Sequence, residues 1–215
     1  MPTPIVHLCT AKKILESFEI KDKPMFYLGS ISPDAFYLAP TYYDLDGFYE
    51  RHKTAHFTNR DFSEWKRSVI KFIEKNKANK NRDFYLGYGV HILTDIYWKE
   101  TTFMEFRQKF NSDEYSHDER RKMFYNDAEI FENELYNKFN LKSDVWGYLT
   151  SCEKIGLKGF VSADETYSWK ENTMRLFDNN EDKPDSKIYF FTYGIVSQFI
   201  ENAAKEILKF IGAKL

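Results

Sequence analysis

Residues 84–98 read FYLGYGVHILTDIYW, an apolar and aromatic stretch in which His91 and Asp95 stand four residues apart. Continuous hydrophobicity over this length predicts a buried helix, and a spacing of four places both side chains on one helix face. An ionised aspartate on an apolar face is costly unless it is paired or binds a metal. Two interpretations therefore remain open: a neutral histidine hydrogen-bonded to Asp95 inside the core, or half of a metal site.

The chain on either side of this stretch also predicts helices. The predicted central helix covers Asp83 to Phe106, and its Gly87 and Gly89, which are costly inside a helix, suit close packing against a neighbour. Other predicted helices begin at Pro4, cover Pro24 to Ser30, follow Asp61 as a cap, and cover 117–139, 143–154, 162–178 and 187–212. Residues 35–60 and 179–187 are predicted loops. Without strand alternation or repeats, the expected fold class is all-α: a single-domain, multi-helix bundle over 1–215 with a buried metal cluster.

Composition limits the classes of partner. With 31 basic and 33 acidic residues the net charge is -2, so strong nucleic-acid binding is not expected. Aromatic residues make up 18% of the chain, which predicts an aromatic core. The apolar excess of the helix after Lys187 suits either that core or a contact with a partner or membrane surface, and the core interpretation is favoured. We expect no transmembrane segment, disulfide framework or signal peptide, and hence a cytoplasmic location. The oligomeric state stays open.

Three further residues share the hydrophobic setting of His91 and Asp95. Asp34 follows Pro33 in SPDAF, His56 lies in KTAHF, and His7 lies in IVHL. Each alone suits a satisfied core residue, but histidine and carboxylate together are the ligands expected for zinc. His52 is a rival for His56, although its charged context indicates an exposed or supporting position. His117, in SHDERR, suits a solvated helix start.

The runs MPTPIVHL (1–8), FYLGSISPDA (26–35), KTAHF (53–57) and FYLGYGVHILTDIYW (84–98) together resemble the zinc-dependent phospholipase C family. The resemblance covers about the first hundred residues and implies an all-helical fold with up to three zinc ions. Single-strand-specific secreted nucleases share this metal architecture.

The resemblance also implies roles for individual residues. Asp34, His56, His91 and Asp95 would hold one zinc, and Asp95 would bridge to a second zinc that His7 binds. Secreted members complete the second site with their N-terminal amine, which here would be that of Met1 or Pro2. The chain departs most from the family at the third zinc site, because no histidine follows Asp95 in IYWKETTF. Glu100 is a possible substitute there. On a later helix, MFYNDAEIF offers Asp127 and Glu129, of which Asp127 is preferred.

The function implied by the resemblance is hydrolysis of a phosphodiester, either a small molecule or a lipid head group, with one to three zinc ions as cofactor. Asp34 would orient or deprotonate the attacking water. Tyr37, Tyr42, Tyr43 and Tyr49 are candidate pocket residues. Two alternatives stay open: a nucleotide phosphodiesterase or nuclease of the same fold, and a non-catalytic metal-binding module with a degenerate site.

Overall fold

The computed structural model describes residues 1–38, 45–178 and 187–212. The helices are α1 (Pro4–Leu15), α2 (Lys23–Gly29), the 3-10 helix η1 (Ser32–Leu38), α3 (Leu45–Ala55), α4 (Phe62–Asn76), α5 (Arg82–Glu100), α6 (Thr102–Lys109), α7 (His117–Lys138), α8 (Leu141–Asp144), α9 (Trp146–Thr150), α10 (Ala163–Asp178) and α11 (Tyr193–Gly212). Over these ranges the extended pairing is limited to an isolated bridge between Leu157 and Val161. The all-α prediction is confirmed.

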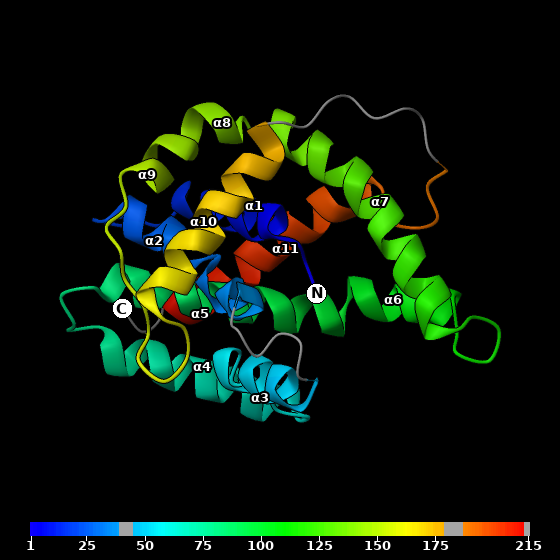
Figure 1. Cartoon of the computed structure of the whole chain (residues 1–215), viewed down its shortest axis with the longest axis horizontal. Coiled ribbons are helices and arrows are strands. Elements are labelled where there is room, and N and C mark those ends of the chain that lie inside the picture. Colours follow the sequence, from blue (N-terminus) through cyan, green and yellow to red (C-terminus); the bar gives the residue numbers. More distant parts are fainter. Residues whose placement is uncertain (39–44, 179–186, 213–215) are drawn as a thin grey trace.

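Helix α5 lies at the centre of the arrangement. It crosses the molecule between α3 and α4 on one side and α1 and α2 on the other, with α7 and α10 flanking the ends (Figure 1). Its buried residues lie on every face of the helix, as the apolar run predicts. Helix α11 packs on α1 and α5 and buries its apolar face there, in agreement with the core interpretation.

Local capping explains where several helices begin. The side chain of Asp61 accepts hydrogen bonds from the backbone N–H groups of Ser63 and Glu64, which confirms the predicted start of α4. Ser116 and Glu119 form a capping box at the start of α7. Pro4 occupies the first turn of α1, where its missing N–H is not needed.

Several helix boundaries differ from the prediction. The central helix ends at Glu100, because Thr101 leaves the helical conformation and its Oγ1 bonds the carbonyl of Tyr97 at 2.6 Å. The segment 35–60 was expected to be irregular, yet it contains η1 and the amphipathic α3, which turn-forming residues obscured. The expected helix over 143–154 ends at Thr150 and is interrupted at Val145. The predicted loop at 179–187 lies almost entirely outside the described residues.

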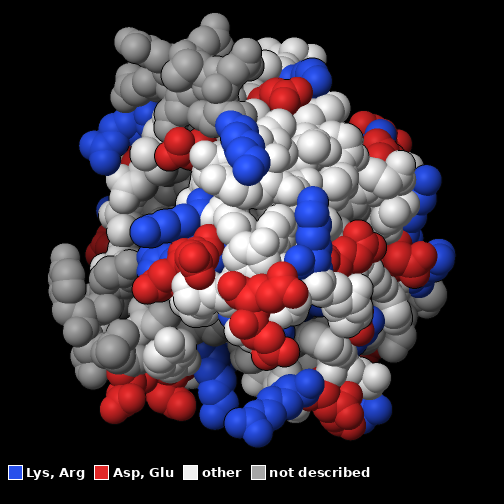
Figure 2. Space-filling model, turned by 90° about the vertical axis from the view of Figure 1, so that its right-hand side faces the viewer, with Lys and Arg blue, Asp and Glu red and all other residues white. Residues whose placement is uncertain are grey.

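Charge is mixed over the face in Figure 2, where lysine and arginine side chains alternate with aspartate and glutamate. This distribution agrees with the small net charge of -2. Within the described ranges, no helix has both the length and the hydropathy needed to span a membrane. Cys9 and Cys152 are both free thiols.

Candidate metal centre

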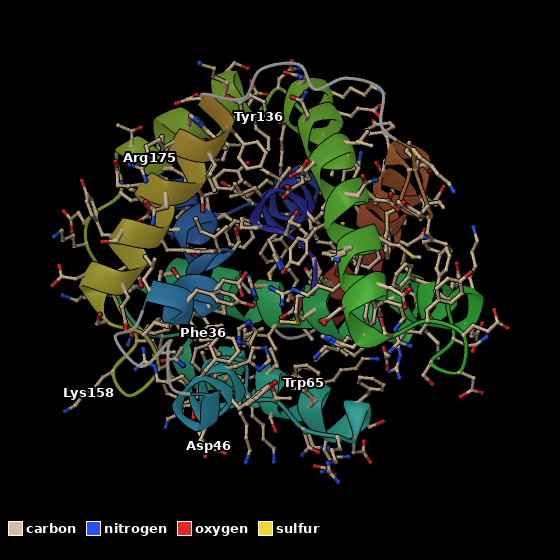
Figure 3. All side chains as sticks on the ribbon, turned by 45° about the vertical axis from the view of Figure 1, so that its right-hand side comes forward. Phe36, Asp46, Trp65, Tyr136, Lys158 and Arg175 are labelled. Carbon is tan, nitrogen blue, oxygen red and sulfur yellow. The ribbon has the colours of Figure 1, made fainter. Side chains whose placement is uncertain are left out.

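Five residues predicted as ligands meet at the middle of α5. His91 and Asp95 lie one turn apart on that helix, and the other three come from α1, η1 and the residue that follows α3. All five are at most 4% exposed: His7, Asp34, His56, His91 and Asp95. Phe36, on η1, covers the cluster, and its ring meets that of His56 edge-on. The Phe36 side chain lies on the side of η1 that faces α3 (Figure 3).

Four of these side chains lie close together, and the ligand atoms of Asp34, His56 and His91 can share an ion. The Nε2 atom of His56 lies 3.3 Å from Asp34 Oδ1, 3.4 Å from Asp95 Oδ2 and 3.3 Å from His91 Nε2. The Nε2 atom of His91 lies 3.7 Å from Asp34 Oδ1 and 3.6 Å from Asp95 Oδ2. A tetrahedral zinc with bonds of about 2.0–2.2 Å needs ligand atoms about 3.3–3.6 Å apart. The spacing therefore fits a zinc ion held by His56, His91 and Asp34, with the carboxylate of Asp95 beside the two imidazoles.

The second carboxylate oxygen of Asp95 faces another candidate ligand. Asp95 Oδ1 lies 3.6 Å from His7 Nε2, and the rings of His7 and His91 stack with their centroids 3.6 Å apart. His7, His91 and Asp95 also form a group whose ligand atoms can share an ion. Asp95 is thus placed between two adjacent positions, one toward His56 and one toward His7.

Unsatisfied polar atoms support a metal over a simple hydrogen-bonded core. Neither carboxylate oxygen of Asp95 and neither ring nitrogen of His7 has a hydrogen-bond partner, although all four atoms are buried. Burying such groups without partners costs several kcal/mol, roughly 1–3 for each neutral group and more for a charge. A bound cation would satisfy these atoms together, so the donor set fits the group that the sequence implied.

Backbone carbonyl groups orient two of the imidazoles. The Nδ1 atom of His91 lies 2.8 Å from the carbonyl oxygen of Ser30, and that of His56 lies 3.1 Å from the carbonyl oxygen of His52. Each Nδ1–H can therefore donate outward, which leaves the Nε2 lone pair directed at the centre. Sequence patterns do not predict the role of Ser30, because its backbone carbonyl is the hydrogen-bond partner of His91. The position of that carbonyl depends on the fold and not on the side chain. His52 proves to be a supporting neighbour of His56, against whose ring it stacks.

Burial keeps the histidines neutral. It lowers the pKa of His56 to about 3 and that of His91 to about 4, and it lowers the pKa of His7 as well. Neutral imidazole is the form that binds metal. Burial raises the pKa of both Asp95 and Asp34, so without a cation these carboxyl groups tend to hold a proton.

The α-amino group of Met1 is buried beside the same cluster. Burial lowers its pKa, and the carboxylates of Asp95 and Asp34 act in the opposite direction. In Figure 1 the N-terminal end lies against α5. The amine of this chain thus stands close to Asp95, on the approach to His7.

The residues proposed for a third site do not converge in this way. Glu100 forms an ion pair with Lys66 at 2.5 Å, and His117 is an exposed side chain on the first turn of α7. Lys99, which no sequence pattern singled out, lies near the cluster: its Nζ stands 4.6 Å from the centre of the Trp65 ring, and its charge acts on Asp95.

The structure corrects the prediction for Asp127. Its carboxylate accepts hydrogen bonds from the backbone N–H groups of three consecutive residues, 189–191, at 2.8–2.9 Å. Asp127 is fully buried, and it belongs to neither group of converging ligand atoms. Asp127 is therefore an anchor for the segment before α11. This anchoring also explains why that helix begins at Tyr193 and not at Lys187.

Comparison with known proteins adds one match. The model of a family described as zinc dependent phospholipase C matches residues 6–201 of the chain. No curated protein and no solved structure matches significantly.

Proposed function

Because the chain belongs to the zinc-dependent phospholipase C family, we propose that it is a phosphoric diester hydrolase whose reaction takes place at the His–Asp cluster on α5. The observation that carries this proposal is the group of ligand atoms from Asp34, His56 and His91, at distances that suit a zinc ion, with Asp95 beside the two imidazoles. We place one ion at this group and a second beside Asp95 and His7.

Zinc at these positions would supply Lewis-acid activation of the phosphoryl group and a water of lowered pKa. The side chains would do the rest. Asp95 would contribute one carboxylate oxygen beside His7 and the other beside His56. Asp34, a candidate ligand of the first ion, would be the group that orients an attacking water and accepts its proton.

The alternatives have less support from the structure. A nuclease that grips nucleic acid needs a long basic groove, and the one face drawn in Figure 2 mixes lysine and arginine with aspartate and glutamate. The residues considered for a third site do not converge, as expected of a degenerate, non-catalytic module, but two groups of buried ligand residues do converge here. The contact between α1 and α11 supports treating residues 1–215 as one domain.

Elemental analysis of the purified protein tests the proposal, beside a His91→Ala, Asp95→Ala double variant. We expect about two zinc equivalents in the wild type, loss of both in the double variant, and hydrolysis of bis(4-nitrophenyl) phosphate by the wild type alone. His117→Ala is the matched control, because His117 is exposed and lies outside the cluster. Bound zinc without hydrolysis of any phosphodiester would favour the non-catalytic module. Absence of zinc after reconstitution would overturn the metal assignment itself.

A further inference from the structure

A pocket of about 510 Å³ opens where the end of α5 meets α4, α6 and the start of α7. Three basic side chains line it, Lys99, Arg107 and Arg120, together with the amides of Gln108 and Asn111. The apolar side chain of Phe103 forms part of the wall. Over the ranges that the structure describes, no acidic residue lines the pocket.

The three cations have no carboxylate partner. Among the residues that the structure describes, none lies within 4.0 Å of an acidic oxygen, whereas nearby Lys66 and Arg67 pair with Glu100 and Glu64. Arg120 makes only a long contact of 3.4 Å to the carbonyl of Phe110, and Lys99 stands over the Trp65 ring. Unpaired cations around a concave surface produce a local field that attracts anions, in a chain whose net charge is -2.

Lys99 joins this pocket to the metal centre. It follows Asp95 by one helical turn, so both side chains lie on the same face of α5. Trp65, under the Lys99 ammonium, donates from Nε1 to the carbonyl of His56 at 2.7 Å. Lys99, in the wall of the pocket, therefore lies one helical turn from Asp95 and contacts Trp65, which is hydrogen-bonded to the backbone of His56.

We propose that this pocket binds a second anionic group of the substrate, so that the preferred phosphodiester carries a further phosphate or carboxylate on its head group. This inference rests on the proposed function for the scissile bond, while the pocket's affinity for anions stands independently of it. A fork of guanidinium donors suits a planar carboxylate or a phosphate. A head group that ends in a quaternary ammonium would face three like charges and is disfavoured.

Two matched diesters test the inference: methyl 4-nitrophenyl phosphate, and the same ester with a carboxyl group at the end of its alkyl chain. We expect the wild type to favour the carboxylated ester in kcat/KM by about tenfold or more. The Arg107→Gln, Arg120→Gln double variant should lose this preference. Arg121→Gln, Lys122→Gln is the matched control, because it removes the same charge from exposed positions of α7 outside the pocket, and it should keep the preference. A wild type without preference, or a pocket variant that retains it, would overturn the proposal.

Equilibrium binding of inorganic phosphate separates this proposal from the catalytic one. Calorimetry on the three proteins should show binding weakened about tenfold by the pocket substitutions and unchanged in the control. Equal binding in all three proteins overturns the anion pocket even where diesters are hydrolysed. Weakened binding in the pocket variant supports it even where no diester is hydrolysed. Circular dichroism checks that each variant is folded.

A lipid and a soluble ester are distinguished by a further comparison. The wild type is incubated with phosphatidylcholine vesicles that contain or lack phosphatidylserine, whose head group bears a carboxylate. Cleavage of phosphatidylserine in preference to phosphatidylcholine, lost in the pocket variant, supports the pocket and assigns the anion to a lipid head group. Cleavage of the soluble carboxylated ester alone supports the pocket with a water-soluble substrate. Preferential cleavage of phosphatidylcholine overturns the inference.

Discussion

At the scale of the residue, Asp95 shows how one side chain can define a site. It is fully buried, both of its oxygens lack hydrogen-bond partners, and each faces a different imidazole. A buried carboxylate in this condition is unfavourable on its own. A bound cation offsets this cost, and without one the carboxyl group tends to hold a proton, so the residue couples the stability of the core to occupancy of the site.

The buried histidines make the metal-free protein sensitive to acid. Burial lowers the pKa of His52 and His56 to about 3 and of His91 to about 4, and that of His7 also falls. The unfolded chain protonates histidine near pH 6.5, so below that pH it binds protons that the folded chain does not, and the unfolding free energy decreases as pH falls toward about 4. Each such proton contributes about 1.4 kcal/mol per pH unit.

The buried carboxyl groups act in the opposite direction. With raised pKa values, Asp34 and Asp95 hold protons in the folded state that the unfolded chain releases above about pH 3.9. The four histidines outnumber these two carboxyl groups, so the net unfolding free energy should still fall. Urea unfolding of the metal-free protein between about pH 6.5 and 4.5 measures it. A stability that stays constant or rises across this interval contradicts the argument, and His56→Gln should show a shallower slope.

The candidate ligands could be recognised from the sequence because each polar residue stood in an apolar context. His7, Asp34, His56, His91 and Asp95 all share this feature, and it reflects their burial directly. Asp127 is buried as well, but its partners are backbone N–H groups more than sixty residues away along the chain. No local sequence pattern distinguishes a carboxylate that binds a metal from one that anchors a backbone segment remote in sequence. The local sequence likewise does not indicate that Lys99 lies close to the cluster.

At the scale of the element, the crossing of α2 and α5 positions the site. Gly29 and Gly87 face each other's helices so closely that a Cβ at Gly87 would lie 2.1 Å from the Phe26 carbonyl oxygen. This approach brings the Ser30 carbonyl within 2.8 Å of His91 Nδ1 and places Asp34, just beyond α2, opposite Asp95. The predicted close packing at the glycines of the central helix is therefore confirmed, and the helix contact is part of the metal centre.

Replacing Gly87 with alanine should disrupt both stability and metal binding. The added methyl group meets backbone on α2, which cannot move like a side chain, so we expect a loss of about 3 kcal/mol or more in unfolding free energy. The displaced helix should also weaken zinc retention, because His91 lies one turn further along. Gly147→Ala is the control: nothing lies within 4 Å of its added Cβ, and a helical alanine should be neutral or stabilising by up to about 1 kcal/mol. Chemical unfolding and zinc content of both variants measure the effect, and equal stability would contradict the packing argument.

Helix boundaries were less predictable than the helices themselves. The break at Thr101 and the start of α11 at Tyr193 depend on a side-chain hydroxyl and on the Asp127 carboxylate, which redirect backbone hydrogen bonds. Helix α3 was missed because Asp46 and Gly47, typical of turns, occupy its first turn. At Thr101 and at the start of α11, a single polar contact outweighed the general hydrophobic pattern.

At the scale of the whole molecule, the metal centre connects segments that are remote in sequence. Its candidate ligands span residues 7–95 and belong to α1, η1, the end of α3 and α5. Elements after residue 110 contribute none of them, although α11 packs on α1 and α10 packs on η1. Metal binding should therefore stabilise the N-terminal half directly and the remainder only through packing.

Removal of zinc should accordingly loosen the molecule unevenly. With the cation gone, Asp95 and His7 are left buried without partners, and the segments they belong to lose the interaction that joins them. Hydrogen exchange after chelation should increase most in α1, η1 and the end of α3, less in α5, whose backbone bonds lie inside one long helix, and least in α7, which carries no ligand. Added zinc should restore protection in the same order, and the His91→Ala, Asp95→Ala variant should exchange like the chelated wild type whether or not zinc is present. Uniform loss of protection across all helices would mean that the ion stabilises the fold as a whole, and no change on chelation would mean that the cluster is a hydrogen-bonded core without a metal.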